Sequence, residues 1–199
     1  LEDGAYVAVM SVGIGSAVAM PVVKDLYKSG VELTMALCDE NKLFEKEYSE
    51  LTKSMKTGTE PIPMIEEQFA EKKPELLVAF GLSADMRGPC EWAIAQGIRT
   101  LVYLIDVSAV SGLELCGAGG VPLKDNKLSY PVTEGQLLDA AAIDWDLHIA
   151  RIAAEGEKET VAAARAQAAK ILRGTDKAAE VAAKCACGGG GACAGAASD

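Results

Sequence analysis

A glycine turn near the start of the chain has the residue types that a phosphate-binding loop needs. Gly13 and Gly15 stand between an apolar run and a helical pattern, and Ser16 and Ala17 follow them. Glycines let the backbone approach a phosphate closely, and the helix that follows offers unpaired N–H groups at the positive end of its dipole. A strand that turns tightly into a helix needs glycines as well, so a purely structural role is the alternative. The full dinucleotide fingerprint is absent, because Val18 stands where its third glycine belongs.

Two acidic residues follow the second apolar run, where a dinucleotide-binding sheet recognises ribose. Asp39 or Glu40 could accept hydrogen bonds from the ribose 2′-hydroxyl and would repel a 2′-phosphate, which favours NAD over NADP. The alternative is a solvated acidic loop, which is the more common meaning of such a pair. We therefore expect any bound NAD to contact residues at the carboxyl ends of the strands, namely Gly13, Gly15, Ser16, Ala17, Asp39 and Gly81.

Three of the six cysteines crowd the end of the chain, at Cys185, Cys187 and Cys193. Thiolates on a glycine-rich segment could hold zinc or an iron–sulfur cluster, with Cys116 or another chain supplying a fourth ligand. The spacing matches no standard site, and the alternative is a tail whose cysteines bind nothing. The single histidine, His148, has no serine or cysteine near it in the sequence, so we expect it to be a packing or surface residue.

Alternating strands and helices would position these residues. Apolar runs rich in β-branched residues predict strands, while helical spacing and glycine or proline boundaries predict helices between them. We expect strands at 5–12, 31–37, 76–80 and 99–107, helices at 18–29, 41–55, 64–72 and 89–96, and loops at 56–63 and 81–88. A loop or small hairpin at 116–131 and a helix at 137–152 follow, and residues 153–184 are rich in alanine and charge, as a helix would be.

This alternation predicts an α/β fold in which helices cover both faces of a parallel sheet, with a helical C-terminal extension. Changes in composition divide the chain into three parts. They are a nucleotide-binding-like domain at 1–108, an arm at 109–152, and an extension with a cysteine- and glycine-rich tail at 153–199.

The composition narrows the class of partner. The chain has 199 residues, half of them hydrophobic, and a formal net charge of −10 at pH 7. Such a charge argues against nucleic acid and anionic membranes as partners. No apolar run reaches the roughly 20 residues of a membrane span, so we expect a cytoplasmic protein without membrane insertion. The cysteines fit a reducing compartment better than a disulfide framework.

The order of these features resembles the nucleotide-binding half of ferredoxin-NADP-reductase-like electron-transfer subunits. That group includes the electron-transfer subunit of dihydroorotate dehydrogenase and the small subunits of sulfide dehydrogenase and of the bifurcating ferredoxin:NADP transhydrogenase. The resemblance covers about residues 4–150. It rests on four segments. The first two are the glycine turn, with Gly13, Gly15, Ala17 and Pro21, and the passage from helix to strand at 26–34. The other two are the exit of the third strand, from Phe80 to Cys90, and the segment Gly97 to Thr100 at the start of the fourth strand.

The chain departs from that family where the resemblance implies a two-iron cluster. Of the four positions that should supply ligands, Cys116 alone is a cysteine, and the others are Ser111, Gly119 and Pro131. One thiolate cannot hold a two-iron cluster, so residues 109–152 are expected to form a degenerate cluster-binding arm. The family's amino-terminal flavin-binding domain has no counterpart here, so we expect no FAD domain in this chain.

Three functions stay open at this point. The first is a subunit of a larger cytoplasmic redox complex, bound to other protein subunits, with a structural role or a metal centre in its tail. The second is a functional NAD(H)-binding electron-transfer module that uses a flavin on a partner chain. The third is a free-standing small-molecule-binding α/β protein. Whether the chain has catalytic activity of its own stays open as well.

Overall fold

The computed structural model describes residues 4–106, 121–125, 127–129 and 137–153. The chain forms two compact units, Leu1–Ile149 and Ala150–Asp199, and the fold below is that of the first. Its elements in chain order are β1 (Tyr6–Val12), α1 (Gly15–Lys28), β2 (Glu32–Cys38), α2 (Glu45–Leu51), β3 (Ser54–Gly58), α3 (Pro61–Phe69), β4 (Leu76–Gly81), α4 (Ser83–Ala95), β5 (Arg99–Leu104), β6 (Val121–Pro122), β7 (Leu128–Ser129) and β8 (Leu138–Asp139). Residues 145–153 are also helical.

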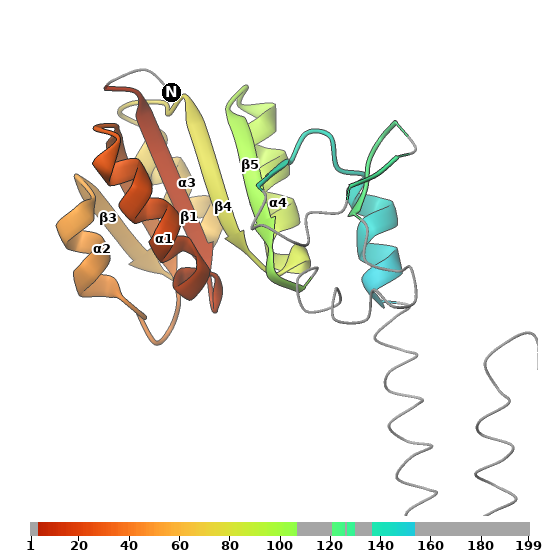
Figure 1. The fold of residues 1–199 in the computed structure, drawn as a ribbon, viewed down its shortest axis with the longest axis horizontal. Coiled ribbons are helices and arrows are strands. Elements are labelled where there is room, and N and C mark those ends of the chain that lie inside the picture. Colours follow the sequence, from red (N-terminus) through yellow and green to blue (C-terminus); the bar gives the residue numbers. More distant parts are fainter. Residues whose placement is uncertain (1–3, 107–120, 126, 130–136, 154–199) are drawn as a thin grey trace, which may run out of the picture. The chain divides into compact units, whose positions relative to one another are not determined.

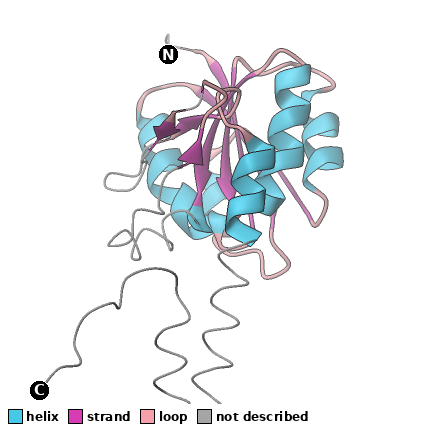
Figure 2. Ribbon diagram, turned by 90° about the vertical axis from the view of Figure 1, so that its right-hand side faces the viewer, coloured by secondary structure: helices cyan, strands magenta, loops and turns pink. Residues whose placement is uncertain are grey.

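Five parallel strands and one antiparallel strand form a sheet in the order β3-β2-β1-β4-β5-β8 (Figure 1). The central strands are almost continuous apolar runs because helices cover both faces of the sheet (Figure 2). The strand order reverses beside β1, since β2 and β3 lie on one side of it and β4 and β5 on the other. The turns after β1 and β4 therefore leave the carboxyl edge of the sheet side by side, which is where open α/β sheets bind ligands.

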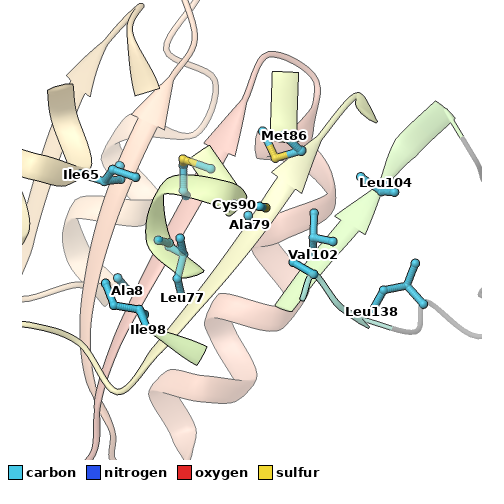
Figure 3. Packing of buried hydrophobic residues seen from close by; sticks show 14 of the residues in the cluster. Ala8, Ile65, Leu77, Ala79, Met86, Cys90, Ile98, Val102, Leu104 and Leu138 are labelled. Carbon is cyan, nitrogen blue, oxygen red and sulfur yellow. The ribbon is translucent and has the colours of Figure 1, made fainter. Parts of the chain in front are cut away.

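Apolar side chains fill the space between the sheet and the helices on each face. On the face of α1 and α2, Val9 and Val23 are fully buried. On the opposite face, α3 and α4 pack Ile65 and Met86 against the sheet, and Figure 3 shows them beside Leu77. Burying a side chain of this size contributes about 1.5–3 kcal/mol, so the two cores fix where the strand ends lie.

The predicted fold class is confirmed, since the sheet is mostly parallel and helices cover both of its faces. The predicted hairpin is also present in part, because β6 pairs with β7 in antiparallel orientation. The helical extension at 153–199 lies outside the described residues apart from its first residue. The predicted domain boundaries at 108 and 152 stay predictions.

The helix predicted for 41–55 is wrong at both ends. α2 covers only Glu45–Leu51, and Met55 lies in β3, paired with Met35 of β2. Leu51 and Met55 are four residues apart, which imitates a helical repeat, but residues 54–58 are long enough to extend the sheet by one strand. The loop predicted for 56–63 is also wrong, since it holds the end of β3 and the start of α3, with Pro61 as the first helical residue.

Two further boundaries differ from the prediction. The expected loop at 81–88 is mostly helix, because α4 begins at Ser83 and contains Pro89 in its interior. An interior proline removes one N–H donor from a helix, and the hydrogen bonds at Ser83 described below stabilise its first turn. The helix predicted for 137–152 is confirmed only over 145–152, since β8 pairs antiparallel with β5 before it. None of the helices in the described residues is long and apolar enough to cross a membrane.

Candidate functional site

The two glycines of the turn after β1 are required for different reasons. Gly13 has a φ of 55°, in the left-handed region that side chains disfavour, and its N–H donates to the Cys38 carbonyl at 2.8 Å. Gly15 lies against the end of β4, where an added Cβ would overlap the Phe80 carbonyl oxygen and lie 2.7 Å from its carbonyl carbon. Only a glycine therefore lets α1 begin directly beside the end of β4.

The first turn of α1 leaves two adjacent backbone donors without a partner. The N–H groups of Ser16 and Ala17 donate to the carbonyls of Gly13 and Ile14 at 3.2 and 3.1 Å. Within the described part of the chain, the N–H groups of Ile14 and Gly15 make no hydrogen bond, and no side chain caps the helix. The first turn holds no acidic residue. Two free amides at the positive end of a 14-residue helix can bind an anion.

Asp39, the predicted ribose acceptor, is held by its own loop. Its carboxylate accepts the N–H of Asn41 at 3.0 Å and the N–H of Leu43 at 3.2 Å, and Ser16 Oγ lies 3.5 Å from it. The side chain is almost buried, whereas that of Glu40 is exposed. Asp39 therefore places a negative charge beside the first turn of α1, and Glu40 is the acidic group that reaches solvent.

Tyr48 ties α2 to the same turn. Its side chain is fully buried, and its hydroxyl donates a hydrogen bond to the Ser16 carbonyl. Burial raises the pKa of Tyr48 well above its ordinary value, so the hydroxyl keeps its proton and stays a donor. The first turn of α1 is thus fixed from the β4 side by Gly15 and from the α2 side by Tyr48.

The start of α4, at the neighbouring strand end, is already occupied by a carboxylate of the chain. Asp106 follows β5, and its two oxygens accept the backbone N–H of Ser83 at 3.0 Å and the Ser83 hydroxyl at 2.7 Å. Gly81 is buried, and a Cβ on it would lie 2.7 Å from the terminal methyl of Met86. α1 and α4 are the two helices that begin where the strand order of the sheet reverses, and of these two only α1 therefore has its N-terminus open.

His148 belongs to this second cluster, which the sequence analysis did not foresee. Its Nε2 lies 2.9 Å from Ser83 Oγ, its ring packs edge-on against Trp145, and its side chain is buried. The sequence predicts that His148 is a packing or surface residue, and its burial excludes a surface position. That prediction also rests on the absence of a serine nearby in the sequence, whereas the fold supplies one in Ser83. A serine and an aspartate at the ends of neighbouring parallel strands could have indicated the Ser83–Asp106 pair, but 65 residues separate Ser83 from His148, and no spacing links them.

The three groups do not form a hydrolytic triad, although a serine, a histidine and an aspartate meet here. In a triad the carboxylate orients the histidine, whereas Asp106 accepts from the serine. Ser83 is also fully buried, so no substrate carbonyl could reach its hydroxyl. We interpret the cluster as a structural contact.

The described cysteines are buried thiols without a metal-binding arrangement. Burial raises the pKa of Cys38 to about 11 and that of Cys90 to about 12, which keeps both as thiols at neutral pH. Cys38 Sγ lies 3.4 Å from Met64 Sδ. Among the described residues no group of three or more His, Cys, Asp or Glu side chains could hold a metal ion. The predicted metal ligands Cys116, Cys185, Cys187 and Cys193 lie outside the described residues.

Two cavities of about 270 Å³ each flank α4 and do not include the glycine turn. One lies between the ends of α3 and α4, with Phe69, Trp92 and Lys73 in its lining. The other lies between α4 and the segment after β8 and includes Trp145. Neither of these two cavities is lined by the residues proposed to bind a cofactor.

The predicted cofactor residues lie at the carboxyl edge of the sheet. Gly13, Gly15, Ser16 and Ala17 lie in the turn after β1 and at the start of α1. Asp39 lies against Ser16, and Gly81 ends the neighbouring strand β4. Their order in the sheet is therefore as the sequence predicted, and their binding role stays a prediction.

Comparison with known proteins gives structural relatives only. No protein-family model matches the chain, and no curated protein matches it. Among solved structures, it is similar to a chain of an NADH-dependent reduced ferredoxin-NADP oxidoreductase, described for flavin-based electron bifurcation, with a TM-score of 0.62 and 19% identity. The match covers 80% of this chain and 61% of that one, so this chain spans less than two thirds of that relative.

A second match is the C-terminal domain of a hydrogenase from Pyrococcus furiosus. It has a TM-score of 0.45 and 14% identity, and it covers 52% of this chain and 94% of that one; a likeness this distant carries no argument. The first match confirms the predicted resemblance at the level of the fold alone.

Proposed function

We propose that this chain is an NAD(H)-binding subunit of an electron-transfer complex. The observation that carries the proposal is the difference between the N-termini of α1 and α4, which lie side by side where the strand order reverses. α1 begins with two free amides and no acidic residue, whereas the start of α4 is filled by Asp106. Among the described residues, a diphosphate bound at this edge would lie against Ile14 and Gly15.

The residues of the edge fit a dinucleotide. The turn presents backbone donors for a diphosphate, and the exposed Glu40 stands at the end of β2, where a ribose hydroxyl would lie. The nearby carboxylate of Asp39 adds negative charge, which disfavours a 2′-phosphate, so NAD is preferred to NADP. When bound, the nicotinamide would supply hydride transfer, and the groups of this chain would only bind and orient it.

A matched pair of substitutions at Ala17 tests the phosphate contact. Ala17 is exposed in the first turn of α1, where an acidic side chain stabilises the helix but repels a bound anion. We expect Ala17→Glu to weaken NADH binding about tenfold or more without lowering the melting temperature, since like charges near a surface cost on the order of 1–4 kcal/mol. Ala17→Gln, of the same size, should retain affinity within about twofold.

Calorimetric titration of the full chain with NADH and NADPH provides the measurement. Binding of NADH that Ala17→Glu weakens by about tenfold or more and Ala17→Gln preserves supports the proposal, and so does weaker binding of NADPH. NADH binding that is insensitive to Ala17→Glu, or absent, contradicts it. Absence would favour the purely structural subunit that the sequence analysis placed first.

The rest of the proposal concerns the complex. The fold of the first match occurs in an oxidoreductase chain longer than this one, so we propose that a flavin on a partner chain accepts or donates the electrons. A cytoplasmic location and a zinc or iron–sulfur centre at Cys185, Cys187 and Cys193 belong to the same proposal. Native purification with identification of bound proteins, flavin and iron tests these points, and a chain that purifies alone without them would favour a free-standing binding protein.

A further inference from the structure

Four exposed apolar side chains gather at the carboxyl edge of the sheet. Among the described residues, six large apolar side chains are exposed, and four of them follow β1, β2 or β4: Ile14 at 60%, Leu43 at 43%, Phe44 at 41% and Leu82 at 43%. These four residues are called the carboxyl-edge patch below. The other two, Tyr27 and Leu147, lie outside the loops of this edge.

The three loops that carry the patch touch one another. The Gly13 N–H bonds to the end of β2, Ser16 Oγ lies 3.5 Å from Asp39, and Gly15 packs on the backbone of Phe80 at the end of β4. β1 lies between β2 and β4 in the sheet, so the turn that carries Ile14 stands between the other two loops. The patch is therefore built from segments far apart in the sequence and is one feature of the folded edge.

The loop after β2 is held in an unfavourable backbone conformation that presents its two apolar residues. Lys42 has a φ of 48° and Phe44 a φ of 62°, and a left-handed backbone costs a non-glycine residue about 1–2 kcal/mol. The Asp39 carboxylate offsets this cost by accepting two N–H groups of the loop. An exposed phenylalanine in such a conformation needs a reason outside the loop itself.

The charges around the patch indicate what it would contact. Lys42 is paired with Glu45 at 3.6 Å. Glu40, which follows β2, and Asp85, in the first turn of α4, are exposed and make no ion pair within the described residues. The border is therefore acidic, as is the whole chain with its net charge of −10. An anionic lipid surface and a second copy of this chain would both be repelled, whereas a protein with basic residues around an apolar face would be attracted.

We infer that the carboxyl-edge patch is the docking surface for a different protein, whose apolar contact face is bordered by lysine or arginine. That protein covers the carboxyl ends of β1 and β4, so its cofactor or substrate could meet a dinucleotide at the glycine turn. The role of the contact in electron transfer rests on the proposed function, but the contact itself does not.

Photo-crosslinking in the native cells tests the inference with the full chain. A photoreactive phenylalanine derivative replaces Leu43, Leu82 or, as a control away from this edge, Tyr27. We expect the Leu43 and Leu82 positions to crosslink the same protein, through peptides that combine apolar residues with lysine or arginine, and the Tyr27 position not to crosslink it.

Charge reversal gives the second measurement. Glu40→Lys with Asp85→Lys should lower the crosslinking yield about fivefold or more, because border charges govern association rates. Glu71→Lys, an exposed acid after α3, is the matched control and should leave the yield within about twofold. Crosslinks only to copies of this chain, different proteins at the two positions, an unchanged yield after charge reversal, or binding of the purified chain to phosphatidylserine vesicles would each overturn the inference. NADH titration of the unchanged chain is independent of these crosslinking outcomes, so failure of the proposed function is recognised separately.

Discussion

Ser83 Oγ lies 2.9 Å from His148 Nε2 and 2.7 Å from a carboxylate oxygen of Asp106. The hydroxyl has one proton, and an ionised carboxylate can only accept, so Ser83 donates to Asp106 and His148 Nε2 carries the proton that it donates to Ser83. Asp106 follows β5, and His148 lies beyond β8. Ser83, at the start of α4, thus makes hydrogen bonds to two residues, Asp106 and His148, that lie 42 positions apart in the sequence.

Removing this hydroxyl should destabilise the protein more than removing an exposed one. Ser83→Ala removes one hydrogen bond from the buried His148 and one from the half-buried Asp106, which costs about 1–3 kcal/mol. Ser49→Ala is the matched control, since its hydroxyl bonds to the Lys46 carbonyl at an exposed position, and it should change stability by less than about 0.5 kcal/mol. Urea denaturation of both variants gives the comparison, and equal midpoints would show that the Ser83 contact contributes nothing.

The two turn glycines should differ in their tolerance of alanine. Gly15→Ala forces a Cβ against the Phe80 backbone, at 2.7 Å from its carbonyl carbon, and a strand in the centre of the sheet cannot move away. We expect a loss of several kcal/mol, as for other severe overpacking. Gly13→Ala meets no atom within 4 Å, so only its left-handed backbone opposes it, at about 1–2 kcal/mol.

A third glycine serves as the internal control for this series. Gly88 lies inside α4, where a Cβ would make an ordinary 3.6 Å contact with Ile62. Gly88→Ala should be neutral or stabilise the protein by up to about 1 kcal/mol, because alanine is the better helix former. Thermal unfolding of the three variants should place Gly15→Ala lowest, and any other variant in that position would contradict the packing argument.

Much of this edge could be predicted from the sequence, because its parts are local. The apolar runs before Gly13, Asp39 and Gly81 identify three strands, and parallel strands end at one edge of the sheet. β3 was missed because Met55 stands in helical phase with Leu51. The start of α4 was missed because Pro89 looks like a first-turn residue, whereas its real cap comes from Asp106, a residue 23 positions away from Ser83. Contacts of that kind depend on the fold and leave no spacing in the sequence.

The buried thiols predict how stability depends on pH in the alkaline range. The folded protein holds the pKa of Cys90 at about 12, above the ordinary value of 9.0. A group with a raised folded pKa contributes stability below its unfolded pKa and loses it as the pH rises toward the folded value. The free energy of unfolding should therefore fall between pH 9 and 11, by up to about 1.4 kcal/mol per pH unit for one fully protected thiol.

Cys90→Ala separates this effect from other alkaline titrations. The variant loses packing at every pH but no longer carries the thiol, so its denaturation midpoint should fall less steeply between pH 9 and 11 than that of the unchanged protein. Alkylation at pH 8 followed by peptide mass spectrometry offers a second check. Cys38 and Cys90 should react only after unfolding, and rapid labelling of either in the folded chain would contradict its burial.

The last prediction concerns the tail cysteines, which lie outside the described residues. Three thiolates within nine residues can bind a metal only with further ligands, and Cys116 or another chain would have to supply them. We expect the natively purified chain to carry zinc or iron, and the triple substitution of Cys185, Cys187 and Cys193 by serine to lose it. The control is the double substitution of Cys38 and Cys90 by serine, since both residues are buried and belong to no metal-binding group in the described residues. The folded fraction of this variant should keep its metal content. Equal metal content in the triple variant and the unchanged chain would contradict a metal centre in the tail and leave the glycine turn as the candidate cofactor site of the described residues.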